Sequence, residues 1–161
     1  MYLKFNSAAR PPHLDRDAVD DRAGRHGKAE IRDFEIPEVK LIVPKRFNDT
    51  RGHFSEIWSE RLFRQEVANV TFVQDNQSVS AKKGTLRGLH FQKPPFAQGK
   101  LVRVVRGSVF DVTVDIRRGS PTYRRHIVTR LDTAEARSYG YRPGFCTGFA
   151  HSRMKRWFST K

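Results

Sequence analysis

Two apolar segments with only a short turn between them restrict this chain to a small set of folds. Leu101–Val105 and Val109–Ile116 are the clearest strand candidates, and Arg106-Gly107-Ser108 joins them. Further short strand candidates recur between turn signals: Leu41–Val43, Phe54–Trp58, Phe72–Asp75 and Leu86–Gln92. Such a succession predicts an all-β antiparallel sandwich or barrel. One short helix is expected over Ser59–Val67, with Ser59 as its N-cap.

The second of these two segments alternates apolar and polar residues with a period of two. Its apolar face carries Phe110, Val112, Val114 and Ile116, and its polar face carries Asp111, Thr113 and Asp115. We expect a half-buried strand. Its polar face either lines a polar cavity or meets solvent, and the spacing does not favour one over the other.

Length and composition indicate one folded domain. A chain of 161 residues is long enough to bury a core, and it has no apolar run of about 18 residues that would span a membrane. The N-terminus lacks an apolar signal segment, which favours the cytoplasm. We expect a poorly structured leader over residues 1–28, one folded domain over residues 29–150 and a basic tail over residues 151–161.

The single cysteine, Cys146, excludes an internal disulfide and a cysteine-rich metal site. A small buried residue is the favoured interpretation for it over a nucleophile. The formal charge of +14 indicates an anionic partner. Because the basic residues are dispersed and no nucleic-acid-binding motif is present, a phosphorylated small molecule is favoured over nucleic acid.

The segment from Gly84 to Arg103 concentrates side chains that carry chemistry. His90 is a candidate base for proton transfer near neutral pH, and Arg87 and Lys100 are cations suited to phosphate or to developing negative charge. On a regular strand, His90 and Arg87 would point to opposite faces unless a bulge intervenes. A lone histidine is more often structural than catalytic. A metal site is disfavoured because no second histidine lies two residues away.

Two other segments present groups that favour ligand contact. Gln74, Asp75 and Asn76 are adjacent hydrogen-bonding side chains, for which an Asx turn is the alternative interpretation. Asp49–Glu56 places Arg51 and Glu56 around Phe54, whose ring is suited to stacking on a planar base. A plain surface hairpin is the alternative there.

Taken together, these motifs resemble the dTDP-4-dehydrorhamnose 3,5-epimerase family over roughly residues 35–150. The resemblance is carried by Asp49–Glu56, Phe72–Asn76, Leu86–Gln92, Ala97–Arg103, Phe110–Arg117 and Ser120-Pro121-Thr122, in the family's order and spacing. It implies a double-stranded β-helix, or cupin-like jelly roll. It also implies a homodimer that works without a metal or other cofactor and contacts neither nucleic acid nor membrane.

The resemblance further implies a substrate, dTDP-4-dehydro-6-deoxyglucose, whose 4-keto group acidifies the hydrogens at C3 and C5. His90 matches the family's general base, and Lys100 matches the cation that stabilises the enolate oxygen. The positions that match substrate contacts are Arg51, Phe54, Glu56, Gln74, Asp75, Asn76 and Arg87. The reaction belongs to the synthesis of rhamnose and other deoxysugars.

The chain departs from the family pattern after Pro143. Thr147 occupies the place of a substrate-binding histidine, and Thr160 falls about where the family has its acid tyrosine. The basic residues of 151–161 fit a strand interior poorly, so we expect the family's late strand and C-terminal region to be absent. A fold lacking that strand should be marginally stable.

A frameshift is our hypothesis for this departure. One set of codons for the family-like sequence Thr-Leu-Glu-Asp-Glu-Thr-Val-Val-Leu-Tyr-Gln, read one base later and followed by one G, encodes a peptide identical to residues 151–161. Gene sequence beyond codon 161 that encodes no family-like C-terminus in the other frame would refute it.

Three functions are therefore open from the sequence. The first is an epimerase impaired by loss of the acid tyrosine. The second is a non-catalytic remnant that at most binds dTDP-sugars. The third, and least favoured, is a basic nucleic-acid-binding protein, which would show a steep dependence of DNA affinity on salt.

Overall fold

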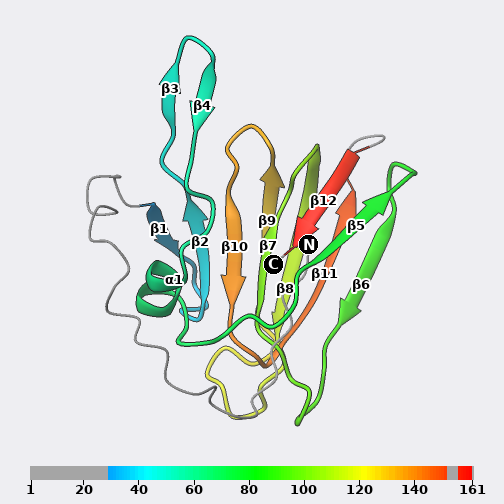
Figure 1. Ribbon diagram of the computed structural model, residues 1–161. Coiled ribbons are helices and arrows are strands. Elements are labelled where there is room, and N and C mark those ends of the chain that lie inside the picture. The colour runs from blue at the N-terminus through cyan, green and yellow to red at the C-terminus, as the bar shows by residue number, and fades with distance from the viewer. Residues whose placement is uncertain (1–28, 152–155, 161) are drawn as a thin grey trace.

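The computed structural model describes residues 29–151 and the backbone of residues 156–160. These residues form two antiparallel sheets that pack face to face, with a separate hairpin and one helix at one side (Figure 1). The expected leader over residues 1–28 lies outside the described residues. The prediction of an all-β fold is confirmed. Within the described residues, no helix has the length and apolar character needed to cross a membrane.

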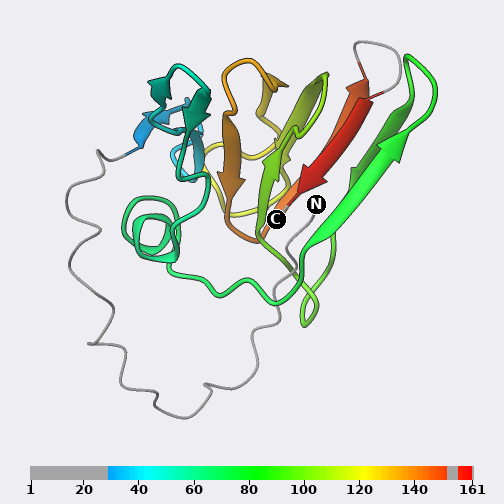
Figure 2. The ribbon, with the colours of Figure 1, turned by 45° about the horizontal axis from the view of Figure 1, so that its top comes forward.

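The larger sheet has the strand order β1-β2-β10-β7-β12-β5. Its strands are β1 (Glu30–Asp33), β2 (Val39–Val43), β10 (Ser138–Tyr141), β7 (Lys100–Arg103), β12 (Arg156–Thr160) and β5 (Asn76–Ser80). The smaller sheet has the order β6-β11-β8-β9. Its strands are β6 (Leu86–His90), β11 (Phe145–His151), β8 (Ser108–Asp115) and β9 (His126–Asp132). Figure 2 shows the two sheets as separate layers.

The main core lies between the two sheets. It is formed by inward-facing apolar and aromatic side chains: Ile36, Val39, Leu41, Val102, Val104, Val109, Ile127, Leu131, Tyr139, Tyr141, Phe145 and Phe149. Cys146 is also buried, as predicted. β11 continues through His151, one residue beyond the expected end of the folded domain.

The helix α1 (Glu60–Glu66) covers one edge of the larger sheet and begins as the sequence predicts. The Ser59 hydroxyl accepts a hydrogen bond from the Leu62 amide at 3.4 Å. On its inner side, Phe63 packs against Trp58 and Phe72, with ring centroids 5.3 and 4.9 Å away. The predicted strand over Phe72–Asp75 is wrong, because Phe72 is held in this aromatic cluster and the ladder of β5 starts only at Asn76.

The segment Phe47–Phe54 forms a hairpin that projects beyond the sheets (Figure 1). Its strands are β3 (Phe47–Asp49) and β4 (Gly52–Phe54). The predicted strand over Phe54–Trp58 is therefore wrong beyond Phe54, since no ladder pairs residues 55–58 within the described part of the chain. The Asp49 carboxylate accepts hydrogen bonds from the Arg51 amide and side chain, which fixes the turn.

The tail departs from our expectation, because Arg156–Thr160 forms the strand β12. It pairs antiparallel with β5, from Arg156 opposite Ser80 to Thr160 opposite Asn76, and also with β7. A β-ladder joins main-chain groups, so its formation does not depend on family-like side chains. Main-chain groups of β5 and β7 that we expected to be unpaired therefore have partners.

The faces of β8 are the reverse of a simple amphipathic strand. Asp111, Thr113 and Asp115 are 1%, 0% and 0% exposed, whereas Phe110 on the apolar face is 45% exposed. Of the two interpretations of the polar face, solvent exposure is wrong. The polar side chains lie between the sheets, and the apolar face points outward.

Asp115 is buried, and a local network of hydrogen bonds satisfies its carboxylate. Its carboxylate accepts hydrogen bonds from Arg117 at 2.8 Å, Ser120 at 2.6 Å and Thr122 at 2.6 Å, and Arg117 also pairs with Glu38. Burial alone would raise the pKa of Asp115, but these hydrogen bonds outweigh it and hold the pKa well below the usual range of a carboxyl group. The network anchors the loop that follows β8.

Candidate functional site

A cleft of about 750 Å³ opens between the two sheets where β6 and β8 end and β11 begins. Its walls combine polar and apolar side chains: Ser78, Leu86, Arg87, Gly88, His90, Phe91, Gln92, Gln98, Lys100, Ile116, Gly144 and Phe145. Three residues predicted from the sequence, His90, Lys100 and Arg87, line this one cleft. A cavity of this size, lined by apolar side chains together with converging polar and charged ones, is typical of a small-molecule site.

A bulge in β6 brings His90 and Arg87 to the same cleft. Thr147 pairs with His90 and Phe149 pairs with Arg87, so three steps along β6 match two along β11. Glycine is required on both sides of this irregular contact. Gly88 has φ +127°, and a Cβ on Gly148 would lie 2.7 Å from the Arg87 carbonyl oxygen.

Lys100 reaches across the sandwich from one sheet to the other. It stands at the start of β7, and its Nζ donates a hydrogen bond to Thr147 Oγ1 on β11 at 2.6 Å. Thr147 is 4% exposed and Lys100 is half-buried. The ammonium is therefore held against β11, at the residue that pairs with His90 of β6.

A buried carboxyl group lies behind Lys100. Burial raises the pKa of Asp111 to about 7, while the charge of Lys100 and a hydrogen bond from Thr113 act in the opposite direction. Burial also raises the pKa of the Cys146 thiol, against the charge of Lys100. Lys100 thus faces a polar interior, which was one of the two interpretations of the polar face of β8. Asp111 was not among the predicted site residues.

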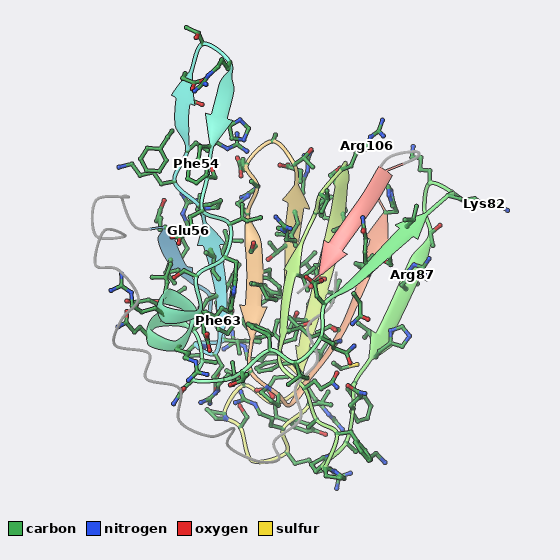
Figure 3. The ribbon with its side chains drawn as sticks, in the orientation of Figure 1. Phe54, Glu56, Phe63, Lys82, Arg87 and Arg106 are labelled. Carbon is green, nitrogen blue, oxygen red and sulfur yellow. The ribbon has the colours of Figure 1, made fainter. Side chains whose placement is uncertain are left out.

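Arg87 is tied to the neighbouring strand of the other sheet. Its Nε donates to Ser80 Oγ at 3.3 Å and its guanidinium donates to the Val79 carbonyl at 3.2 Å. Both acceptors lie on β5, so this arginine links β6 to β5 at the mouth of the sandwich. Figure 3 shows Arg87 on β6, at one side of the molecule.

Two polar atoms in the cleft walls have no hydrogen-bond partner among the described residues: Ser78 Oγ and Gln98 Oε1. A buried polar atom without a partner costs free energy unless a ligand or water satisfies it. We treat both as candidate ligand contacts. Gln98 lies in the motif segment Ala97–Arg103 but was not selected as a site residue, and no motif position gave a signal for Ser78.

Arg51 and Phe54 on the hairpin, and Glu56 just after it, do not line this cleft. Phe54 is 61% exposed, and Figure 3 shows Phe54 and Glu56 at the opposite side of the molecule from Arg87. Within one chain, the predicted contacts on this hairpin are therefore separated from His90 and Lys100. The hairpin presents its polar and aromatic side chains outward.

Gln74, Asp75 and Asn76 are likewise not part of the cleft lining. Asn76 opens β5, and its main chain lies opposite Thr160 of β12. The charge of Asp75 acts on Arg103 of β7. These three residues therefore lie along the β5–β7 side of the larger sheet, beyond the cleft wall that Ser78 forms.

The chemistry of the cleft is that of a proton-transfer site with a nearby cation. An imidazole can remove a proton from carbon if a carbonyl group acidifies that carbon, and an ammonium can stabilise the resulting enolate oxygen. The described residues contain no cluster of three or more His, Cys, Asp or Glu side chains that would hold a metal ion. The arrangement suits a ligand that has a carbonyl group and negative charge.

Comparisons with known proteins agree with this chemistry. The family described as dTDP-4-dehydrorhamnose 3,5-epimerase matches residues 33–159. A dTDP-4-dehydrorhamnose 3,5-epimerase of Sinorhizobium fredii is 52% identical over 119 residues, which are 74% of this chain and 61% of that protein. The chain thus spans about three fifths of the length of this curated relative.

Solved structures show the same fold. A Bacillus anthracis dTDP-4-dehydrorhamnose 3,5-epimerase with TDP and pyrophosphate bound has a TM-score of 0.79 and 36% identity, covering 83% of this chain and 76% of its own. A Legionella pneumophila epimerase in complex with dTDP-4-keto-L-rhamnose has a TM-score of 0.75 and 39% identity, covering 83% and 70%. The expected cupin-like jelly roll is therefore confirmed.

Proposed function

Because the chain belongs to the dTDP-4-dehydrorhamnose 3,5-epimerase family, we propose that it binds dTDP-4-dehydro-6-deoxyglucose and exchanges protons at C3 and C5 of the sugar. The observation that carries this proposal is that His90 and Lys100 line the same cleft, although different sheets supply them. Either residue alone would not indicate catalysis, because isolated histidines are often structural and isolated lysines often lie on the surface.

The reaction starts with removal of a proton from the carbon next to the 4-keto group. His90 Nε2 or Nδ1 accepts that proton, and the electron pair moves into the carbonyl group to give an enolate. Lys100 donates a hydrogen bond to the enolate oxygen, where charge develops. Solvent then delivers a proton to the opposite face of the same carbon, which re-forms the C–H bond and the carbonyl group and inverts the configuration, and His90 releases its proton to solvent.

Binding of the nucleotide part relies on positive charge at the mouth of the cleft. Arg87 lies there, held by β5, and a guanidinium suits a diphosphate. The net charge of +14 also attracts a dianionic substrate. Ser78 and Gln98 present polar atoms to the sugar from the cleft wall.

A homodimer accounts for the separation of the hairpin from the cleft. The outer face of the smaller sheet exposes Phe110 at 45% and Val128 at 55%, and Val112 and Val114 lie beside them. An apolar sheet face of this kind is suited to a second copy of the chain. In such a pair, Arg51, Phe54 and Glu56 contact the nucleotide in the partner's cleft.

Binding without turnover is the second candidate function, and Thr147 favours it. Threonine has no titratable side chain near neutral pH, whereas the resembling family has a histidine at this position. A chain that binds dTDP-sugars with unchanged affinity in the His90→Ala variant, and that exchanges no substrate protons, would be such a remnant.

The test of the proposed function is proton NMR of dTDP-4-dehydro-6-deoxyglucose in D₂O with the purified chain. We expect deuterium at C3, C5 or both, and the sugar configuration shows whether inversion is completed. Loss of the acid of the family typically lowers the rate by about 10²–10⁴-fold, so long incubations are needed. Absence of exchange by a folded chain would contradict the proposal.

A further inference from the structure

We propose that Thr147 is a positioning residue for Lys100, whose ammonium it holds in the cleft next to the base. This inference rests on the proposed function, because Thr147 would hold the lysine whose ammonium stabilises the enolate. The family has a histidine at this position, so the hydrogen bond from Lys100 to a threonine hydroxyl is a feature of this chain.

The geometry that carries the inference joins the two sheets. Lys100 Nζ donates to Thr147 Oγ1 at 2.6 Å, which is the short distance expected when one partner of a hydrogen bond is charged. The acceptor is rigidly placed, because Thr147 lies inside β11 and pairs with Thr113 of β8 on one side and His90 of β6 on the other. A β-branched side chain also has few rotamers.

Thr147 therefore has contact with both parts of the candidate machinery. Its main chain is in register with His90, and its hydroxyl binds Lys100. A lysine side chain has a flexible four-carbon stem, so an ammonium without a fixed acceptor would sample many positions. The hydroxyl fixes one N–H and leaves the other ammonium hydrogens for a ligand or for neighbouring groups.

A buried carboxyl group near the Lys100 ammonium favours a cation there. Asp111, which is 1% exposed, lies close enough for its charge to interact with Lys100. Because Lys100 is half-buried, losing the hydrogen bond to Thr147 leaves one N–H of a partly desolvated ammonium to find another acceptor. Removing the Thr147 hydroxyl should therefore shift the ammonium and slow the chemical step, while substrate contacts elsewhere in the cleft persist.

The experiment compares Thr147→Val, which removes the hydroxyl at nearly constant volume, with Thr147→Ser, which keeps it. Thr129→Val is the matched control, since Thr129 is a buried threonine on β9 at the far edge of the same sheet. The first readout is kcat and KM for deuterium exchange into dTDP-4-dehydro-6-deoxyglucose. The second, in the protein without substrate, is the exchange rate of the Lys100 ammonium protons by ¹⁵N NMR, assigned with Lys100→Arg.

We expect Thr147→Val to lower kcat roughly tenfold or more with little change in KM, the effect of losing a hydrogen bond to a charged group. It should also speed the exchange of the Lys100 ammonium protons about tenfold. Thr147→Ser should keep kcat and the ammonium exchange rate close to those of the unmodified chain. Thr129→Val should change neither value.

Two outcomes separate this inference from the proposed function. If the unmodified chain exchanges no substrate protons, the proposed function fails, and the ammonium exchange rate still decides whether Thr147 holds Lys100. If substrate protons exchange and Thr147→Val leaves both kcat and the ammonium exchange rate unchanged, the inference is overturned while the proposed function stands.

Discussion

Gly88 of β6 and Gly148 of β11 approach so closely that a Cβ atom on Gly88 would lie 2.4 Å from the Cα atom of Gly148. Gly88 also has φ +127°, a conformation that other residues rarely adopt. This contact lies at the bulge that puts Arg87 and His90 on one cleft. The site therefore depends on two residues that carry no functional group.

Gly88→Ala should destabilise the fold and move β6. We expect a loss of at least about 2 kcal/mol in the free energy of unfolding, because backbone strain and a clash with backbone act together. Denaturant unfolding followed by circular dichroism measures it. Gly119→Ala is the control, since a Cβ there meets nothing within 4 Å. Equal stabilities of the two variants would contradict the account.

Asp111 should make the stability fall as pH rises toward neutrality. Burial raises its pKa to about 7 in the folded chain, whereas an unfolded aspartate titrates near 4. The folded state therefore binds this proton more tightly. The contribution is fully present below about pH 4 and is lost as pH rises through about 7. Urea unfolding at a series of pH values should show a decline of order 1 kcal/mol per pH unit at most.

Asp111→Asn should remove this part of the pH dependence, because an amide does not titrate in this range. Asp115 and Glu38 act with the opposite sign: their pKa values are lowered in the folded chain, so their contribution is lost as pH falls below about 4. Measurements between pH 5 and 8 therefore isolate Asp111. Parallel stability profiles for the variant and the unmodified chain would show that Asp111 is not the group involved.

The network around Asp115 should be among the strongest polar contributions to the fold. Its side chain is 0% exposed and that of Arg117 is 25% exposed. Removing one partner of a buried ion pair lowers the free energy of unfolding by about 3–5 kcal/mol. We expect Asp115→Ala to lower it by about 3 kcal/mol. The exposed pair Arg32–Glu30, with side chains 54% and 59% exposed, supplies the control. If Glu30→Ala lowers the thermal midpoint as much as Asp115→Ala, the burial argument is wrong.

Charge on the outer face of the smaller sheet should separate the proposed dimer. Val128→Lys places an ammonium on the exposed apolar face that also carries Phe110. Light scattering after size-exclusion chromatography should then report the mass of a single chain, near 18.7 kDa. Val105→Lys tests specificity, because Val105 is 47% exposed outside that face. An unmodified chain that is already monomeric would exclude the dimer.

Much of the fold follows from local sequence patterns. The strands before and after Gly107, the helix capped by Ser59 and the hairpin around Arg51 were predictable from spacing and turn residues, because each depends on local backbone preferences. That β7 and β8 enter different sheets was not predictable in this way. The resemblance of the motifs then selected the jelly roll among sandwiches and barrels. His90, Arg87 and Lys100 were found in this way as well.

Features set by tertiary contacts were not predictable from the sequence. The alternation of apolar and polar residues on β8 indicates two faces but does not show which face points inward. In the structure the polar face points inward, where Lys100 of the larger sheet lies near Asp111. Ser78 carries no motif signal and enters the cleft only through the packing of β5 beside β6. The pairing of β12 contradicts an argument from side-chain polarity, because the ladder depends on main-chain groups.

The central claim is that His90 and Lys100 form one proton-transfer site, and the rate of deuterium incorporation at C3 and C5 of dTDP-4-dehydro-6-deoxyglucose tests it most directly. We compare the unmodified chain with His90→Ala, and with His126→Ala as a control at an exposed histidine on β9. The account predicts exchange by the unmodified and His126→Ala chains and none by His90→Ala. Equal exchange by all three chains, or no exchange by a folded unmodified chain, would contradict it.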